Sequence, residues 1–121
     1  MKAMDIIDRV DMMEANQYSP EQKLRWLSTL DGKVYYEVIL THEGGKLGLP
    51  PDYQTGQEQL IIGAPYGEDI YYYYLMAMIE AENNENARYA KRMTQFNNAY
   101  QQWCNWYNRA NKPLSTGKQF I

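Results

Sequence analysis

Apolar side chains recur every three or four residues along most of the chain, and this spacing predicts α-helices. Over residues 3–14 they share one face while acidic residues occupy the others, and the apolar set is Ala3, Ile6, Ile7, Val10 and Met13. The polar residues 16–18 interrupt the pattern. We therefore expect a short amphipathic first helix over residues 3–14.

The second predicted helix has the clearest start signal in the sequence. Ser19 suits the N-cap, Pro20 suits the first helical position, and Gln22 is placed to complete a capping box. An apolar stripe follows at steps of three and four: Leu24, Leu27, Leu30, Val34 and Val38.

This helix should reach about Thr41 and end before Gly44–Gly45. Gly32 lies inside it. The glycine either weakens the helix by about 1 kcal/mol relative to alanine or marks a close contact with another helix.

Residues 43–65 predict a long loop, because eight glycines and prolines fall within this stretch: Gly44, Gly45, Gly48, Pro50, Pro51, Gly56, Gly63 and Pro65. Loops of this length in compact domains are usually functional or flexible. Residues 59–62 predict a short strand inside it.

A third helix is predicted from residue 67, where Glu68 and Asp69 complement the positive end of the helix dipole. Residues 70–81 are apolar or aromatic on almost every side, so this helix should be the central and most buried one. The polar residues 82–86 predict a turn.

The last helix, over about residues 85–110, has the most regular stripe, which is Tyr89, Met93, Phe96, Tyr100, Trp103 and Tyr107. Pro113 should end the helical region. Together these elements predict an all-α fold: a small four-helix domain over residues 1–113, with a long loop between helices two and three. Residues 114–121 form a C-terminal tail that is either flexible or docks on a partner.

Composition narrows the class of protein. The 121 residues suit one domain. The longest apolar run, 70–79, is half of the roughly 20 residues that a membrane span needs, and the N-terminus lacks the pattern of a signal peptide. We therefore expect a cytoplasmic product without a membrane partner.

The chain has 12 tyrosines and 3 tryptophans against 2 phenylalanines, which favours half-buried surfaces and interfaces over a dry core.

Charge is unevenly distributed along the chain. Residues 1–82 carry six basic and 14 acidic side chains, a net charge of −8, and residues 83–121 carry six and one, a net charge of +5, giving −3 in total. These are either two solvated faces of one domain or complementary surfaces that meet head to tail between copies, as in rings and filaments.

Candidates for catalysis are few. His42, the only histidine, is either a general base or a helix-end residue that interacts with free carbonyl groups, and Cys104 is either a nucleophile or a packed thiol. The carboxylate pairs Glu68 with Asp69 and Glu80 with Glu82 point in different directions on a helix. We expect no catalytic residues, no metal site and no cofactor, and hence no enzyme.

Two groups of residues are candidates for partner binding. In the run 71–74 the tyrosines point in every direction around a helix, so some face the core and others, with Tyr72 and Tyr73 as candidates, face a partner. In the tail, Leu114, Phe120 and Ile121 are apolar residues near the chain end that suit docking.

Three stretches together resemble the small helical head–tail connector, or adaptor, proteins of prophages in Gram-positive bacteria. They are residues 18–32 (YSPEQKLRWLSTLDG), residues 64–66 with 70–75 (APY and IYYYYL), and residues 96–100 with 106–109 (FNNAY and WYNR). The resemblance spans about residues 4–113 and rests on the order and spacing of these motifs.

The resemblance implies a structural virion protein that forms a ring under the portal and extends the DNA channel. Its partners would be the portal protein and neighbouring connector or tail proteins, with DNA passing through without specific binding. It implies assembly in the host cytoplasm and then a place at the head–tail junction of the virion. Because such proteins commonly contact the portal through their C-terminal segment, residues 114–121 would have that role. The alternatives are a small helical protein-binding regulator without a virion role and a DNA-binding domain that uses Arg88, Lys91 and Arg92.

Overall fold

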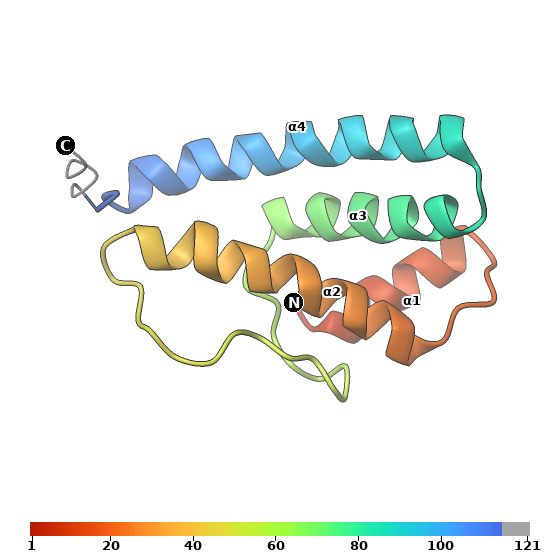
Figure 1. Cartoon of the computed structure of the whole chain (residues 1–121), viewed down its shortest axis with the longest axis horizontal. Helices are drawn as coiled ribbons and strands as arrows, with labels where there is room; N and C mark the ends of the chain where they lie inside the picture. Colours follow the sequence, from red (N-terminus) through yellow and green to blue (C-terminus); the bar gives the residue numbers. More distant parts are fainter. Residues whose placement is uncertain (115–121) are drawn as a thin grey trace.

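The fold is all-α, as the sequence predicts (Figure 1). The computed structural model describes residues 1–114. Its elements in chain order are α1 (Ala3–Met13), α2 (Pro20–Glu37), the 3₁₀ turn η1 (Ile39–Thr41), α3 (Tyr66–Glu82) and α4 (Asn86–Ala110). α3 packs along α4 and also contacts α1 and α2, so it is the central helix.

Local signals set the starts of the first two helices. The Asp5 carboxylate accepts a hydrogen bond from the Lys2 N–H at 2.9 Å, and Ser19 Oγ accepts one from the Gln22 N–H at 3.1 Å. Pro20 occupies the first turn of α2. Each oxygen satisfies an N–H group that has no partner inside the helix, which is why these helices begin where the sequence predicts.

The end of the second helix is tighter than expected. The α-helix ends at Glu37, and the chain continues to Thr41 as the 3₁₀ turn. Thr41 Oγ1 donates to the Glu37 carbonyl at 2.9 Å and His42 Nδ1 lies 2.6 Å from the Val38 carbonyl. Side chains thus take the carbonyl groups that further helical turns would use.

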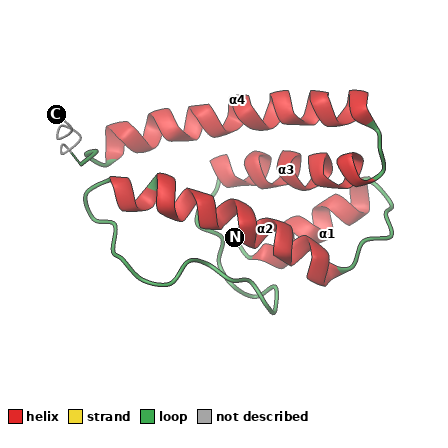
Figure 2. Ribbon diagram, in the orientation of Figure 1, coloured by secondary structure: helices red, strands yellow, loops and turns green. Residues whose placement is uncertain are grey.

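The predicted strand at 59–62 is wrong, since residues 1–114 contain only two isolated bridges, Lys2 with Gln59 and His42 with Pro113. Pairing with the N-terminus stops after one bridge because the chain enters α1 at Ala3. The next two N–H groups, of Ile61 and Ile62, donate to side chains instead of a neighbouring strand. The loop itself is as long as predicted and runs beneath α2 (Figure 2).

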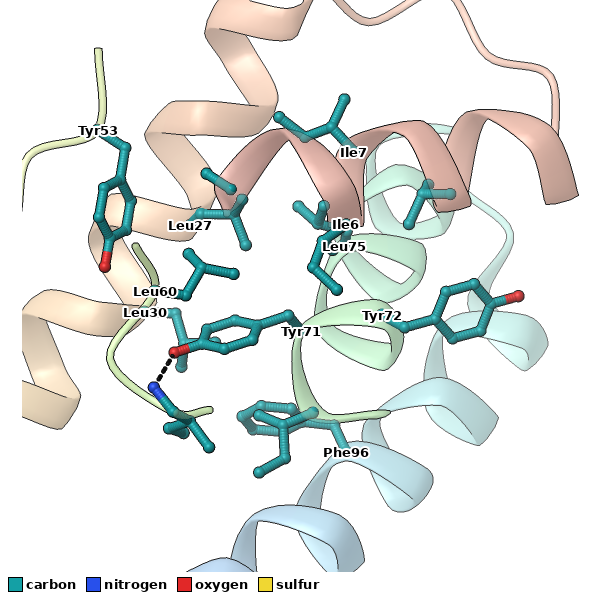
Figure 3. Packing of buried hydrophobic residues seen from close by; sticks show 14 of the residues in the cluster. Ile6, Ile7, Leu27, Leu30, Tyr53, Leu60, Tyr71, Tyr72, Leu75 and Phe96 are labelled. Atoms are coloured by element: carbon teal, nitrogen blue, oxygen red, sulfur yellow. Dashed lines mark hydrogen bonds between the residues drawn. The ribbon is translucent and has the colours of Figure 1, made fainter. Parts of the chain in front are cut away.

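The core surrounds α3. Ile70, Tyr71, Leu75 and Ile79 are fully buried, and Figure 3 shows Leu75 beside Ile6 of α1. No described side chain or backbone atom from another element lies within 4 Å of a Cβ built at Gly32, so of the two alternatives for this glycine the close contact with another helix is excluded.

The turn between α3 and α4 is confirmed at residues 83–85, with Asn84 at a φ of +59°. The stripe of α4 faces α3: Phe96 and Trp103 are buried, and the other members are half-buried. The stripe is therefore part of the core of the single chain.

Candidate interaction site

An aromatic groove lies where α4 approaches its C-terminal end. It has a volume of about 400 Å³. Three segments far apart in sequence line it: Ile39 of η1; Ile61, Gly63, Ala64, Pro65 and Tyr66 at the loop end and start of α3; and Trp103, Trp106 and Tyr107 of α4. A pocket of this size and apolar character is typical of a binding site.

The exposed wall of the groove is Trp106, whose side chain is 41% exposed. Its ring lies 5.8 Å from that of Tyr66 and 6.3 Å from that of Tyr107, centroid to centroid. Trp103, one turn earlier, is only 4% exposed and packs 5.1 Å from Tyr107. Trp103 therefore supports the groove from inside, while Trp106 is available to a partner.

His42 is a structural residue that ties η1 to α4. It is 7% exposed, its Nδ1 lies 2.6 Å from the Val38 carbonyl, and its Nε2 lies 2.6 Å from Asn108 Oδ1. Its ring packs edge-on against Tyr107 at 4.8 Å. Both ring nitrogens are engaged within the fold, so His42 is the helix-end residue rather than a base facing a substrate.

The segment after α4 folds back onto the backbone of residues 41–43. The Glu43 N–H donates to the Lys112 carbonyl at 2.8 Å and the Leu114 N–H donates to the Thr41 carbonyl at 2.9 Å. Leu114, one of the predicted partner residues, is thereby anchored at its backbone while its side chain stays 46% exposed. Phe120 and Ile121 lie outside the described residues.

The two predicted partner tyrosines have different environments. Tyr72 is buried, 8% exposed, and the Arg9 guanidinium carbon lies 4.2 Å from its ring centroid. Tyr73 is half-buried and lines a shallow polar hollow with Asp69 and Gln95. Only Tyr73 of this pair has appreciable surface for contact with another molecule.

A buried carboxyl group holds the loop that supplies one wall of the groove. Asp31 of α2 is fully buried and accepts hydrogen bonds from the Tyr53 hydroxyl, from the Tyr71 hydroxyl at 2.6 Å, and from the Ile61 N–H at 3.0 Å. Tyr71 Oη in turn accepts the Ile62 N–H at 2.9 Å, the bond drawn in Figure 3. Burial raises the pKa of Asp31, whereas the three donors oppose that rise by favouring the ionised form.

Sequence reasoning missed this network, although a signal for it exists. Asp31 lies four residues after Leu27 and three before Val34, so it occupies the apolar stripe of α2. A carboxylate at a core position needs buried donors, and the nearby tyrosine-rich segments supply them.

The loop also carries two highly exposed apolar side chains. Leu47 is 86% and Leu49 is 92% exposed. The Tyr35 hydroxyl donates to the Lys46 carbonyl at 2.7 Å, which fixes this part of the loop to α2. Individual exposed apolar side chains are common on protein surfaces, so these two leucines do not by themselves mark a contact site.

The remaining chemical candidates are separated in space or turned inward. Cys104 is half-buried and burial raises the pKa of its thiol, which disfavours the nucleophilic thiolate. Glu80 is fully buried beside Arg92, whereas Glu82 is exposed, so these two acids do not form a pair.

Across the described part of the chain, no helix combines the length and the apolar character that crossing a bilayer requires. In comparisons with protein families, curated proteins and solved structures, nothing matches this chain. The resemblance to phage connectors therefore stays a prediction that rests on the quoted motifs.

Proposed function

We propose that the chain is a structural virion protein, a head–tail connector that forms a ring under the portal and extends the DNA channel. The observation that carries the proposal is the aromatic groove with Trp106 on its rim and the exposed Leu114 on the adjoining segment. Tryptophan and other aromatic residues in pockets are the usual anchors of protein–protein interfaces.

The distribution of surface features supports repeated contacts between copies. The groove lies towards the C-terminal end of α4, and Met12 and Met13, 86% and 66% exposed, end α1 near the opposite end of the α3–α4 pair (Figure 1). A protomer with different apolar surfaces at two ends suits a head-to-tail contact, which closes into a ring when the rotation permits. The acidic residues 1–82 and the basic residues 83–121 add a complementary charge.

In this proposal the partners are the portal protein, the neighbouring connector or tail proteins and further copies of the chain. DNA passes through the ring without specific binding, which an acidic surface favours because phosphates are repelled. The tail residues Leu114, Phe120 and Ile121 contact the portal, and Tyr73 contributes to a surface between copies. The protein is assembled in the host cytoplasm and then resides at the head–tail junction of the virion.

The experiment is light scattering on the protein alone and mixed with the portal protein encoded by the same prophage. We expect a ring, or a shift of the chain onto the portal. Trp106→Ala should weaken this association at least tenfold while the helical circular dichroism signal is kept. Gln101→Ala, an exposed change on another face of α4, is the matched control. A wild-type chain that stays monomeric and ignores the portal would overturn the proposal.

The groove also favours a second candidate, a small helical regulator that binds one partner protein and has no virion role. Its volume of about 400 Å³ falls within the range of sites that take a single side-chain cluster or small ligand. A monomer that ignores the portal but binds another protein through Trp106 would support this second function.

A further inference from the structure

Three glutamates converge at the end of the bundle opposite the aromatic groove. Glu14 follows the end of α1, Glu80 lies in the last turn of α3, and Glu85 precedes the start of α4. One carboxylate oxygen from each lies within 4.8 Å of the other two. These residues are brought together by packing of α1 on α3 and by the α3–α4 turn, since Glu14 and Glu80 are far apart in sequence.

Glu80 has an unsatisfied oxygen at the centre of this cluster. The residue is 0% exposed, and its Oε2 pairs with Arg92 Nε at 3.3 Å. Its Oε1 is buried and has no hydrogen-bond partner among the described residues, and the same holds for Glu85 Oε1. A buried carboxylate oxygen without a donor is costly, so either a bound cation or a proton must offset its charge.

The electrostatic surroundings favour a cation. α1 and α3 both direct their C-terminal ends, the negative ends of their dipoles, towards this region, and within residues 1–114 neither helix has a basic residue in its last turn. The available positive groups are Arg92, on Glu80, and the exposed Arg88, whose Nη1 lies 4.0 Å from Glu85 Oε1. Three carboxylates therefore face two arginines, only one of which is close.

We propose that Glu14, Glu80 and Glu85 bind a hard divalent cation, with Ca²⁺ as the best fit. Ca²⁺ binds oxygen ligands at about 2.3–2.6 Å, so two ligands on opposite sides of the ion lie about 4.8 Å apart. The three carboxylate oxygens all lie within 4.8 Å of one another, which is within the span of the oxygen ligands around one Ca²⁺. Mg²⁺ demands near-ideal octahedral geometry and dehydrates reluctantly, so it is the weaker fit to three protein carboxylates.

Water supplies the remaining ligands, because Glu14 and Glu85 are half-buried and leave the site open on one side. The ion connects α1 to the α3–α4 turn and thereby stiffens this end of the bundle. The competing arrangement is a proton on Glu80, which burial favours by raising its pKa. The two arrangements differ in whether a cation binds in a saturable way, and the inference does not depend on the connector proposal.

The test is calorimetric titration of the chelator-treated full chain with CaCl₂ at pH 7, alongside thermal unfolding. MgCl₂ and NaCl of equal ionic strength are run in parallel. We expect one Ca²⁺ per chain, weaker Mg²⁺ binding, and a Tm that rises with the logarithm of Ca²⁺ concentration above the Kd.

Two variants locate the site. Glu14→Gln removes one ligand but leaves the Glu80–Arg92 pair in place, so the chain stays folded and Ca²⁺ affinity should fall at least tenfold. Glu82→Gln removes an exposed acid from the same end of α3 and should bind Ca²⁺ like the wild type. If the titration with CaCl₂ showed no saturable heat of binding, and CaCl₂ changed the Tm only as much as NaCl of equal ionic strength, the proposal would be overturned in favour of a protonated Glu80. Unchanged affinity in Glu14→Gln would overturn it by placing the ion elsewhere.

Discussion

Replacing Tyr71 by phenylalanine removes one buried oxygen and two hydrogen bonds. Tyr71 is 0% exposed; its hydroxyl donates to Asp31 Oδ1 at 2.6 Å and accepts from the Ile62 N–H at 2.9 Å. Because the Ile62 N–H can only donate and the Asp31 oxygen accepts, the hydroxyl proton points at Asp31. The ring itself fits unchanged in the variant, so the effect isolates the polar network.

The expected magnitude follows from the two groups left behind. Loss of a hydrogen bond to a carboxylate costs about 1.5–3 kcal/mol, and a buried N–H without a partner costs about 1–3 kcal/mol. We therefore expect Tyr71→Phe to lower the free energy of unfolding by about 2.5–6 kcal/mol, a large part of the stability of an ordinary domain. Tyr53→Phe removes one bond to the same carboxyl group and should cost about 1.5–3 kcal/mol.

The assay is urea denaturation followed by circular dichroism at 222 nm, with Tyr72→Phe as the matched control. Tyr72 is the next residue, is also buried, and points away from the loop (Figure 3); no described residue hydrogen-bonds its hydroxyl. Tyr72→Phe should change stability by less than about 0.5 kcal/mol. If the free energies of unfolding of Tyr71→Phe and Tyr72→Phe differed by less than about 0.5 kcal/mol, the argument that the Asp31 network holds the loop would be refuted.

Three further predictions concern the core, one helix and the loop. Trp103→Ala should lower the free energy of unfolding by about 3–5 kcal/mol because the side chain is 4% exposed. Trp106→Ala should keep the Tm within a few degrees of the wild type and weaken only association; equal losses of stability in both variants would contradict this division. Gly32→Ala should stabilise the chain by up to about 1 kcal/mol, measured in urea, because a Cβ there meets no described atom within 4 Å; destabilisation would indicate an unrecognised contact. Glu58 accepts N–H bonds from residues 54–56, which lower its pKa to about 2. Since its folded pKa lies below the unfolded value, its contribution is complete above about pH 4.5 and is lost as the pH falls towards 2; NMR titration of the amides of residues 54–56 should report that midpoint, and a midpoint near 4.5 would contradict it.

Much of the secondary structure follows from neighbouring residues. The start of α2 depends on Ser19 and Pro20, which act on N–H groups one turn away, and the turn at 83–85 depends on a short polar run. The periodicity of α4 also predicts its buried face, with Phe96 and Trp103 in the core. Such signals operate over a few residues, so a sequence displays them without knowledge of the fold.

The strand predicted at 59–62 is absent because strand formation depends on residues distant in sequence. A strand needs a neighbour along its whole length, and here the chain that pairs with Gln59 becomes α1 one residue later. The acceptors that replace that neighbour are Asp31 and Tyr71, which lie on two other helices. No local pattern specifies that outcome.

The sequence by itself determined four helices, a long loop and an aromatic composition suited to interfaces, because helix periodicity and capping are local. Only the tertiary structure decided that Asp31 is a buried acceptor for two tyrosines and that Tyr72 is buried. The convergence of Glu14, Glu80 and Glu85 likewise required the packing of α1 against the α3–α4 turn. The cost of burying a charge depends on whether residues distant in sequence place hydrogen-bond donors or positive charges beside it. The sites of this chain are therefore defined by packing rather than by a sequence motif.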